Sequence, residues 1–161
     1  MTDIRTGIGI DAHRFAPGRL LILGGVTIDF PLGLAGHSDA DVLAHAITDA
    51  LLGAAGMGDI GKLFPDSDYT FKDADSLVLL KTAWDLVSAE GWKISNIDSV
   101  VICQKPKILP YIDAMRKNFS ASLGNLDPSR ISIKGTTTEK MGFTGREEGI
   151  AAQAVILIRK D

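Results

Sequence analysis

The sequence predicts an α/β (α+β) sandwich whose helices cover one face of a β-sheet. Three observations lead to this fold class. Residues 4–15 alternate between two faces, as a strand does, and 149–158 form an apolar run suited to a closing strand. Residues 39–55 carry apolar side chains at helical spacing instead. The predicted order, ββ-α-α-β-α-ββ, contains no repeat and no linker, so we expect a single domain over 1–161.

The first strand, 4–15, has two unlike faces. Its apolar face, which we expect to enter the core, carries Ile8, Ile10 and Ala12. The other face is bare backbone leading to two polar groups, with Gly7, Gly9, Asp11 and His13. The next segment, 20–30, is apolar and β-branched around a Gly-Gly pair, which predicts a strand with a turn or bulge.

The helix predicted over 39–55 has one apolar and one polar face. The apolar face carries Leu43, Ala46, Ile47, Ala50, Leu51 and Ala54. The polar face carries Asp41, His45 and Asp49. Ser38 or Asp39 is the expected N-cap. The following segment, 56–68, is rich in glycine and aspartate, which predicts a shaped loop.

The second half of the chain alternates helices and strands. A helix over about 74–90 ends at Gly91, and a strand follows over 96–104. The next helix, 110–123, has a proline at its first position and a glycine after its end. A strand over 131–137 precedes the closing strand.

Composition narrows the classes of partner. A formal charge of -3 gives no overall basic field for nucleic acid or a membrane, although a local basic site could bind phosphate. The lone Cys103 excludes an internal disulfide and a four-cysteine metal site, and we expect it to be buried in a strand. No run of about 18 apolar residues occurs, and the start of the chain lacks a signal-peptide pattern, so a cytoplasmic location is predicted.

Asp11, His13 and His45 are candidate metal ligands. Residues i and i+2 of a strand point the same way, so Asp11 and His13 can direct an oxygen and a nitrogen at one point. One carboxylate and two histidines would hold zinc with an open fourth position, although iron(II) uses the same ligand types. Either Asp41 or Asp49 could accept the second ring N–H of His45. The plainer alternative is a set of solvated polar side chains.

Two segments suit phosphate. GHSDAD (36–41) gathers an imidazole and a hydroxyl at a helix start, although Ser38 and Asp39 could simply cap the helix. KGTTTEKMGFTGREEG (134–149) offers threonine hydroxyls, a carboxylate for the magnesium that diphosphates carry, and an arginine. An ordinary polar turn is the alternative there.

Taken together, these motifs resemble the 2-C-methyl-D-erythritol 2,4-cyclodiphosphate synthase family. The resemblance runs from RTGIGIDAHRF through GHSDADVLAHAITDALLGAAGMGDIGKLFPDSD and KPKILP to GTTTEKMGFTGREEGIAAQAV. It implies a ferredoxin-like protomer with a mixed sheet, assembled as a homotrimer with active sites shared between neighbouring subunits. Two small departures are Ala40, where the family more often has glycine, and Cys103, where it often has alanine.

The resemblance also implies a role for each matching residue of the first half. It gives one zinc ion per subunit to Asp11, His13 and His45. The phosphate would contact His37 and Ser38, with His37 stabilising the transition state. The ribose would be held around Asp59, Ile60 and Gly61. The loop over the methylerythritol end would comprise Phe64, Pro65, Asp66, Ser67 and Asp68.

The remaining roles fall on the second half. The cytosine would be recognised by the backbone of Cys103, Gln104, Lys105, Pro106, Lys107, Ile108 and Leu109. The diphosphate would meet Thr136, Thr137, Thr138 and Glu139, with Thr137 stabilising the transition state and Glu139 binding magnesium or manganese. A terpenoid diphosphate at the trimer axis would meet Phe143 and Arg146.

The implied reaction converts 4-diphosphocytidyl-2-C-methyl-D-erythritol 2-phosphate into a cyclic diphosphate and CMP. The nucleophile is the substrate's own 2-phosphate, which fits the absence of a Ser-His-Asp order or an activated thiol. Two alternatives stay open on the residues alone. One is a zinc-dependent phosphohydrolase of a nucleotide-diphosphate substrate, with water as nucleophile. The other is a cytidine-nucleotide or terpenoid-phosphate binding protein without turnover.

Overall fold

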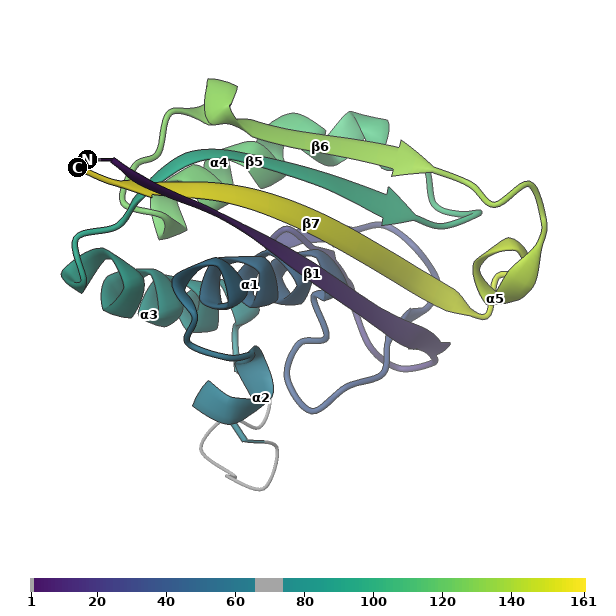
Figure 1. Ribbon diagram of the computed structural model, residues 1–161. Coiled ribbons are helices and arrows are strands. Elements are labelled where there is room, and N and C mark those ends of the chain that lie inside the picture. Colours follow the sequence, from purple (N-terminus) through teal and green to yellow (C-terminus); the bar gives the residue numbers. More distant parts are fainter. Residues whose placement is uncertain (1, 66–73) are drawn as a thin grey trace.

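The main sheet is mixed and has five strands. The computed structural model describes residues 2–65 and 74–161. The strand order is β4-β1-β7-β5-β6, formed by Gly33–Leu34, Asp3–Ala16, Gly149–Lys160, Lys93–Ile102 and Ile131–Thr136 respectively. β5 and β6 run parallel, and every other neighbouring pair is antiparallel. The α/β class predicted from the sequence is therefore confirmed, with the two ends of the chain side by side at one end of the sheet (Figure 1).

The three longer helices are α1 (Val42–Ala55), α3 (Ser76–Ala89) and α4 (Ile112–Ser122). α1 packs against β1 and β7 and has α3 beside it, whereas α4 packs against β6 and α3. In Figure 1 the strands pass in front of α1 and α4, which leaves the near face of the sheet without a helix. The predicted apolar stripe of α1 is confirmed, because all six of its residues are buried. Among the described residues, no helix is long and apolar enough to cross a membrane.

The two faces of β1 lie opposite to the prediction. Ile8 and Ile10 are 63% and 69% exposed on the open face of the sheet, whereas Gly7 and Gly9 are buried against α1. A Cβ at either glycine would lie 1.9 Å from a carbonyl oxygen of α1, that of Ala50 or Ala46. The helix therefore approaches the strand so closely that only glycine fits, and the polar pair that follows on the same face points toward α1.

The Gly-Gly pair is the turn of a hairpin that stands apart from the main sheet. β2 (Leu21–Leu23) and β3 (Val26–Ile28) pair with each other as a two-stranded sheet. Gly24 and Gly25 connect them, both with positive φ, as a two-residue hairpin turn requires. The predicted turn is confirmed.

Two boundaries differ from the prediction for physical reasons. α1 begins at Val42 with Asp41 as its N-cap, not at Asp39, because Ala40 has a left-handed φ of 59° that a helix cannot continue. The predicted loop 56–68 contains the short helix α2 (Ile60–Leu63), which Asp59 caps. Smaller elements are the 3₁₀ turns Leu109–Tyr111 and Pro128–Arg130 and the helix α5 (Gly142–Gly145). Pro110 thus lies in a 3₁₀ turn before α4 rather than in the helix.

Candidate metal centre and phosphate-binding cavity

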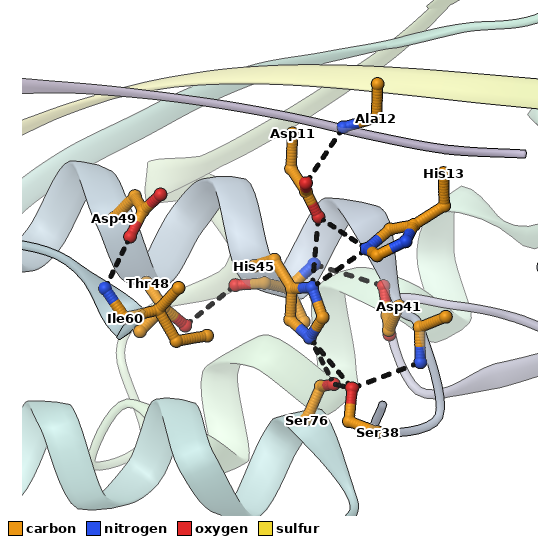
Figure 2. A network of polar contacts seen from close by, with 12 residues as sticks. Asp11, Ala12, His13, Ser38, Asp41, His45, Thr48, Asp49, Ile60 and Ser76 are labelled. Atoms are coloured by element: carbon orange, nitrogen blue, oxygen red, sulfur yellow. Dashed lines mark hydrogen bonds and ion pairs between the residues drawn. The ribbon is translucent and has the colours of Figure 1, made fainter. Parts of the chain in front are cut away.

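Asp11, His13 and His45 converge on one point, as predicted (Figure 2). Asp11 Oδ2 lies 2.9 Å from His13 Nε2 and 3.0 Å from His45 Nδ1, and the two nitrogens are 3.3 Å apart. The strand directs the first two side chains to one side, and the close packing of β1 on α1 brings His45 to meet them. Within 2–65 and 74–161 this is the one group of three such residues that could hold a metal ion.

The chemistry of this donor set fits a small divalent cation. In a tetrahedral zinc site with bonds of about 2.0–2.1 Å, neighbouring ligand atoms lie about 3.3 Å apart. The three atoms here form a triangle with sides of 2.9–3.3 Å, so little movement is needed to receive an ion. One carboxylate and two imidazoles leave the fourth position open for a ligand oxygen.

His13 is held in the tautomer that a metal needs. Its Nδ1 lies 2.7 Å from the backbone carbonyl oxygen of Ala35, which can only accept a hydrogen bond. Nδ1 therefore carries the proton, and the lone pair of the neutral ring lies on Nε2, which faces the other two donor atoms.

His45 is oriented by residues that the sequence did not indicate. Its Nε2 lies 2.8 Å from Ser76 Oγ and 3.2 Å from Ser38 Oγ, below the ring in Figure 2. The prediction that Asp41 or Asp49 accepts this ring N–H is wrong. The Asp41 carboxylate accepts a hydrogen bond from the backbone N–H of Ala44 instead, and the Asp49 carboxylate accepts one from the backbone N–H of Ile60. Ser76 was missed because it is 31 residues from His45 in the sequence and meets it only through the packing of α3 on α1.

The electrostatics of the triad favour a charged Asp11. Burial opposes ionisation, but the hydrogen bonds and charges of His13 and His45 outweigh it and hold the pKa of Asp11 well below its usual range. Burial also opposes charge on His13, yet the hydrogen bond and negative charge of Asp11 raise its pKa. Protonation of His13 and metal binding therefore compete for the same nitrogen.

Asp41 serves the fold rather than the site. Its side chain is fully buried, where Oδ1 accepts from the backbone N–H of Ala44 and Gly24, both at 3.0 Å, and Oδ2 from that of Gly25 at 2.7 Å. Burial raises the pKa of Asp41 to about 6, which still leaves it ionised at neutral pH. Burial also raises the pKa of Asp49, which accepts from the backbone of Ile60 at 2.7 Å. The alternative of a solvated charged helix face is therefore wrong for Asp41 and His45.

A cavity of about 290 Å³ opens beside the triad. Its walls include the triad and, from the predicted phosphate and ribose segments, His37, Ser38, Ile60, Gly61 and Phe64. His37 Nε2 is buried and has no hydrogen-bond partner among the described residues, so this nitrogen is available to a ligand. Arg19, which the sequence did not single out, donates to the carbonyl oxygens of Gly36 at 3.3 Å and Ser38 at 2.5 Å. It thereby fixes the backbone that carries His37.

The neighbouring predicted residues lie around this cavity in different ways. Asp59 does not line it, because its carboxylate accepts from the backbone of Lys62 at 2.8 Å and caps α2. Pro65 is exposed at the end of the described segment. The predictions for Asp66, Ser67 and Asp68 lie outside the described residues.

A second cavity, of about 470 Å³, lies where β5 and β6 end. Most of the predicted cytosine segment lines it, with Cys103, Gln104, Pro106, Lys107, Ile108, Leu109, Thr136 and Thr137 among its walls. Lys105 points elsewhere and forms an ion pair with Glu147 at 3.2 Å. Cys103 is buried just beyond the end of β5, and burial raises the pKa of its thiol to about 11, which disfavours the thiolate that a nucleophile requires.

The threonine-rich segment forms a tight turn after β6. Thr137 Oγ1 donates to Glu139 Oε1 at 3.0 Å, and both side chains are exposed. Thr138 is turned inward, where its hydroxyl meets the Thr144 hydroxyl at 2.9 Å. Phe143 lies in α5 and is 42% exposed. Arg146 follows α5 and forms an ion pair with Glu148 at 2.6 Å.

The two cavities are separate within one chain. They share no lining residue. The sheet register places Asp11 of β1 level with Ala152, Val101 and Gly135 on the next three strands. Three strand spacings correspond to about 14 Å between β1 and β6. A single protomer therefore does not bring the metal triad and the threonine-rich turn together.

Known proteins match this chain over nearly its whole length. The model of the YgbB family matches residues 4–159. A curated relative from Neisseria gonorrhoeae, named 2-C-methyl-D-erythritol 2,4-cyclodiphosphate synthase, is 59% identical over 158 residues, which is 98% of each chain.

Solved structures show the same fold. The bifunctional IspDF of Campylobacter jejuni matches with a TM-score of 0.95 and 48% identity over all of this chain, which spans 43% of that longer protein. A CDP complex of IspF from Plasmodium falciparum matches with a TM-score of 0.86 and 39% identity, over 98% of this chain and 97% of that one.

Proposed function

The chain belongs to the YgbB family, and we propose that it closes 4-diphosphocytidyl-2-C-methyl-D-erythritol 2-phosphate into 2-C-methyl-D-erythritol 2,4-cyclodiphosphate with release of CMP. The chain is an enzyme of the isoprenoid pathway, a cyclodiphosphate synthase like the relatives that it matches over nearly their whole length. The observation that carries the proposal is the convergence of Asp11, His13 and His45 with His37 and Ser38 in one cavity.

In this reaction the nucleophile belongs to the substrate. An oxygen of the 2-phosphate forms a bond to the β-phosphorus, and the bond from that phosphorus to the oxygen bridging to the α-phosphorus breaks. The bridging oxygen leaves with its electron pair as part of CMP. No water is consumed and no side chain is modified, so the protein acts by positioning two repelling phosphates and neutralising their charge.

The first cavity holds the reacting phosphates in this proposal. Asp11, His13 and His45 bind zinc, and Glu139 binds magnesium or manganese together with the substrate diphosphate. When bound, these cations neutralise phosphate charge and polarise the phosphorus–oxygen bonds. The unpartnered Nε2 of His37 supports a direct hydrogen bond to the phosphate, and Ser38 adds a hydroxyl beside it. The ribose lies along Asp59, Ile60 and Gly61.

The second cavity holds the cytosine end. Its largely apolar walls and the backbone of 103–109 suit a flat base. Thr137, with its hydroxyl beside the Glu139 carboxylate, is placed to stabilise the transition state next to the metal ligand. Cys103 is bulkier than the alanine common in the family, and it narrows this cavity.

The separation of the cavities supports a homotrimer with shared sites. We propose that the second cavity of one protomer meets the first cavity of its neighbour. The open face of the sheet carries Ile4, Ile8 and Ile10, each more than 60% exposed, with Val155 beside them on β7. Apolar residues gathered on one sheet face suit burial against two further copies of this ferredoxin-like protomer. Phe143 and Arg146 then lie near the threefold axis, where a terpenoid diphosphate could bind.

A lone buried thiol agrees with a cytoplasmic location.

Product analysis in ¹⁸O-labelled water tests the function. We expect the cyclic diphosphate and CMP in equal amounts, with no solvent oxygen in either. A linear product that carries ¹⁸O would favour a metal-dependent phosphohydrolase, and saturable CMP binding without any product would favour a binding protein. A parallel assay with a chelator, followed by added zinc, tests whether turnover depends on the metal.

A further inference from the structure

Ser76, the first residue of α3, lies directly behind the metal triad. Its side chain is 1% exposed, and its Oγ is 2.8 Å from His45 Nε2, the ring nitrogen that faces away from Asp11 and His13 (Figure 2). Neither the motif pattern nor the predicted roles include this residue. A buried hydroxyl in contact with a metal-binding imidazole suggests that Ser76 has a task in the site.

Asp39 fixes the position of Ser76. The Ser76 hydroxyl donates to Asp39 Oδ1, and the Ser76 backbone N–H donates to Asp39 Oδ2 at 3.1 Å. The backbone N–H of Asp39 in turn donates to the carbonyl oxygen of Ala74 at 3.2 Å. Three hydrogen bonds therefore join the loop before α1 to the start of α3, and the hydroxyl of Ser76 has little freedom to rotate.

The Ser76 hydroxyl has only one hydrogen, and this determines which atom donates in each of its hydrogen bonds. A carboxylate only accepts, so the single hydrogen of the Ser76 hydroxyl points to Asp39. Ser76 Oγ must then accept from His45, which places the imidazole proton on Nε2. In the neutral form of His45, which is the form that binds a metal, the lone pair is thereby left on Nδ1, the atom that faces Asp11 and His13. The arrangement parallels that of His13, where Ala35 holds the other nitrogen.

Ser38 is the competing partner. Its Oγ lies 3.2 Å from His45 Nε2 and 3.5 Å from Ser76 Oγ, and it accepts from the backbone N–H of Ala40 at 3.2 Å. The contact with His45 is longer than the one made by Ser76, and within 2–65 and 74–161 no carboxylate accepts from the Ser38 hydroxyl to orient its hydrogen. Ser38 also lines the cavity, where a ligand would draw its hydroxyl away from His45.

We propose that Ser76 and Asp39 are positioning residues that hold His45 in its metal-binding tautomer and strengthen its bond to the metal. The inference rests on the proposed metal site. Removing a group that orients a metal-binding histidine typically costs about 10–100-fold in metal affinity. We expect a loss of this size for Ser76→Ala and for Asp39→Asn, because a carboxamide cannot accept from both the hydroxyl and the backbone N–H of Ser76.

The test is the zinc affinity of the folded protein, measured by competition with a chromophoric chelator. Ser76→Thr keeps the hydroxyl and should retain zinc affinity within a few-fold. On β5, two strands away from β1, the matched control Ser99→Ala removes another buried hydroxyl, one that donates to Ser132 O at 2.9 Å. Its zinc affinity should equal that of the unaltered protein. The visible absorption spectrum of cobalt-loaded Ser76→Ala should also differ from that of the cobalt-loaded unaltered protein. The reason is that His45, no longer oriented by Ser76, would change the ligand field of the cobalt ion.

The outcomes separate a positioning role from a structural one. If Ser76→Ala only lowers the stability of the metal-free protein while zinc affinity and the cobalt spectrum stay unchanged, the inference is wrong. If Ser38→Ala lowered the zinc affinity by about 10–100-fold and Ser76→Ala left it unchanged, the positioning role would belong to Ser38. If Ser76→Thr fails to fold, Asp39→Asn decides, and unchanged zinc affinity in that variant contradicts the inference. Failure of the unaltered protein to bind zinc would instead overturn the proposed metal site.

Discussion

His13 Nε2 and His45 Nδ1 lie 3.3 Å apart although 32 residues separate them in the chain. His13 comes from near the end of β1, and His45 comes from the first turn of α1. Asp11 Oδ2 lies within 3.0 Å of both nitrogens, so the pair shares one carboxylate. Each ring also has its second nitrogen held from behind, His13 by a backbone carbonyl and His45 by Ser76. The three candidate ligands are therefore held in an arrangement that fits a metal ion.

Replacing His45 with alanine should remove bound zinc and abolish turnover while leaving the fold largely intact. His37→Ala is the matched comparison, since it lies in the same cavity but outside the triad. It should retain one zinc per chain and lose about 10²–10³-fold in kcat, as expected for the loss of one hydrogen bond to a transition-state oxygen. Metal analysis of the purified variants checks both expectations. Stoichiometric zinc in His45→Ala would contradict the assignment.

Shared sites predict that two inactive variants complement each other. His13→Ala damages the first cavity and Glu139→Ala the turn beside the second. In randomly mixed trimers about a quarter of the sites pair two undamaged halves, so about a quarter of the activity should return. The variants are unfolded together, refolded at equal amounts and assayed, with native mass spectrometry to confirm mixing. Mixed trimers without activity would place the whole site within one protomer.

Gly9→Ala should be strongly destabilising. The added Cβ would lie 1.9 Å from the carbonyl oxygen of Ala46 and 2.8 Å from the backbone nitrogen of Ala50, so β1 and α1 must separate. Overpacking of this kind costs about 1–3 kcal/mol or more of unfolding free energy, and the shift of β1 should also weaken zinc binding. Gly53 lies on the exposed side of α1, where an added Cβ would come no closer than 4.0 Å to any described atom outside its chain neighbours and the backbone of its own helix. Gly53→Ala should therefore stabilise the protein by about 0.5–1 kcal/mol. Urea unfolding of both variants tests this contrast.

Asp41→Asn should lower stability at pH 8 even without metal. Three backbone N–H groups share the two carboxylate oxygens, and a carboxamide would turn an NH₂ group toward at least one of them. A buried unsatisfied donor costs about 1–3 kcal/mol. Asp75→Asn is the control, because Asp75 caps α3 with a single bond to the Leu77 N–H at an exposed site. Asparagine caps a helix about as well as aspartate, so the free energy of unfolding should change little there. The free energy of unfolding of both variants is measured by urea titration after a chelator has removed any metal. Equal stability of the two variants would contradict the role of Asp41 as a buried acceptor of backbone hydrogen bonds.

The reactivity of Cys103 should depend steeply on pH. Burial disfavours the thiolate and raises the pKa to about 11, so at pH 8 about one thiol in a thousand is ionised. The rate of alkylation by iodoacetamide should rise about tenfold per pH unit between pH 8 and 10, and it should be far below that of the unfolded chain at every pH. Mass spectrometry of timed samples follows the reaction. A rate that levels off by pH 8.5 would show an ordinary, accessible thiol.

The amino-acid pattern alone predicted the fold class, most elements and the candidate metal triad, and for the triad it left solvated side chains as an open alternative. The i, i+2 spacing of Asp11 and His13 fixes their common direction in any strand, and the stripe on 42–55 fixes the buried side of its helix. These features are local, since they depend on the period of one element. The order of the motifs from GIDAHRF to GTTTEK predicted the family and a role for each matching residue. No single spacing could have predicted either.

Only the tertiary structure decided which face of β1 is buried. Local alternation placed Ile8 and Ile10 in the core, but α1 packs so closely on Gly7 and Gly9 that the glycine face is the inner one. The same packing brings Ser76 to His45 and leaves Asp41 and Asp49 to backbone N–H groups. Such choices depend on the distance between elements far apart in the sequence. Periodicity carries no information about that distance. The common direction of Asp11 and His13 could be predicted because it depends only on their spacing within β1.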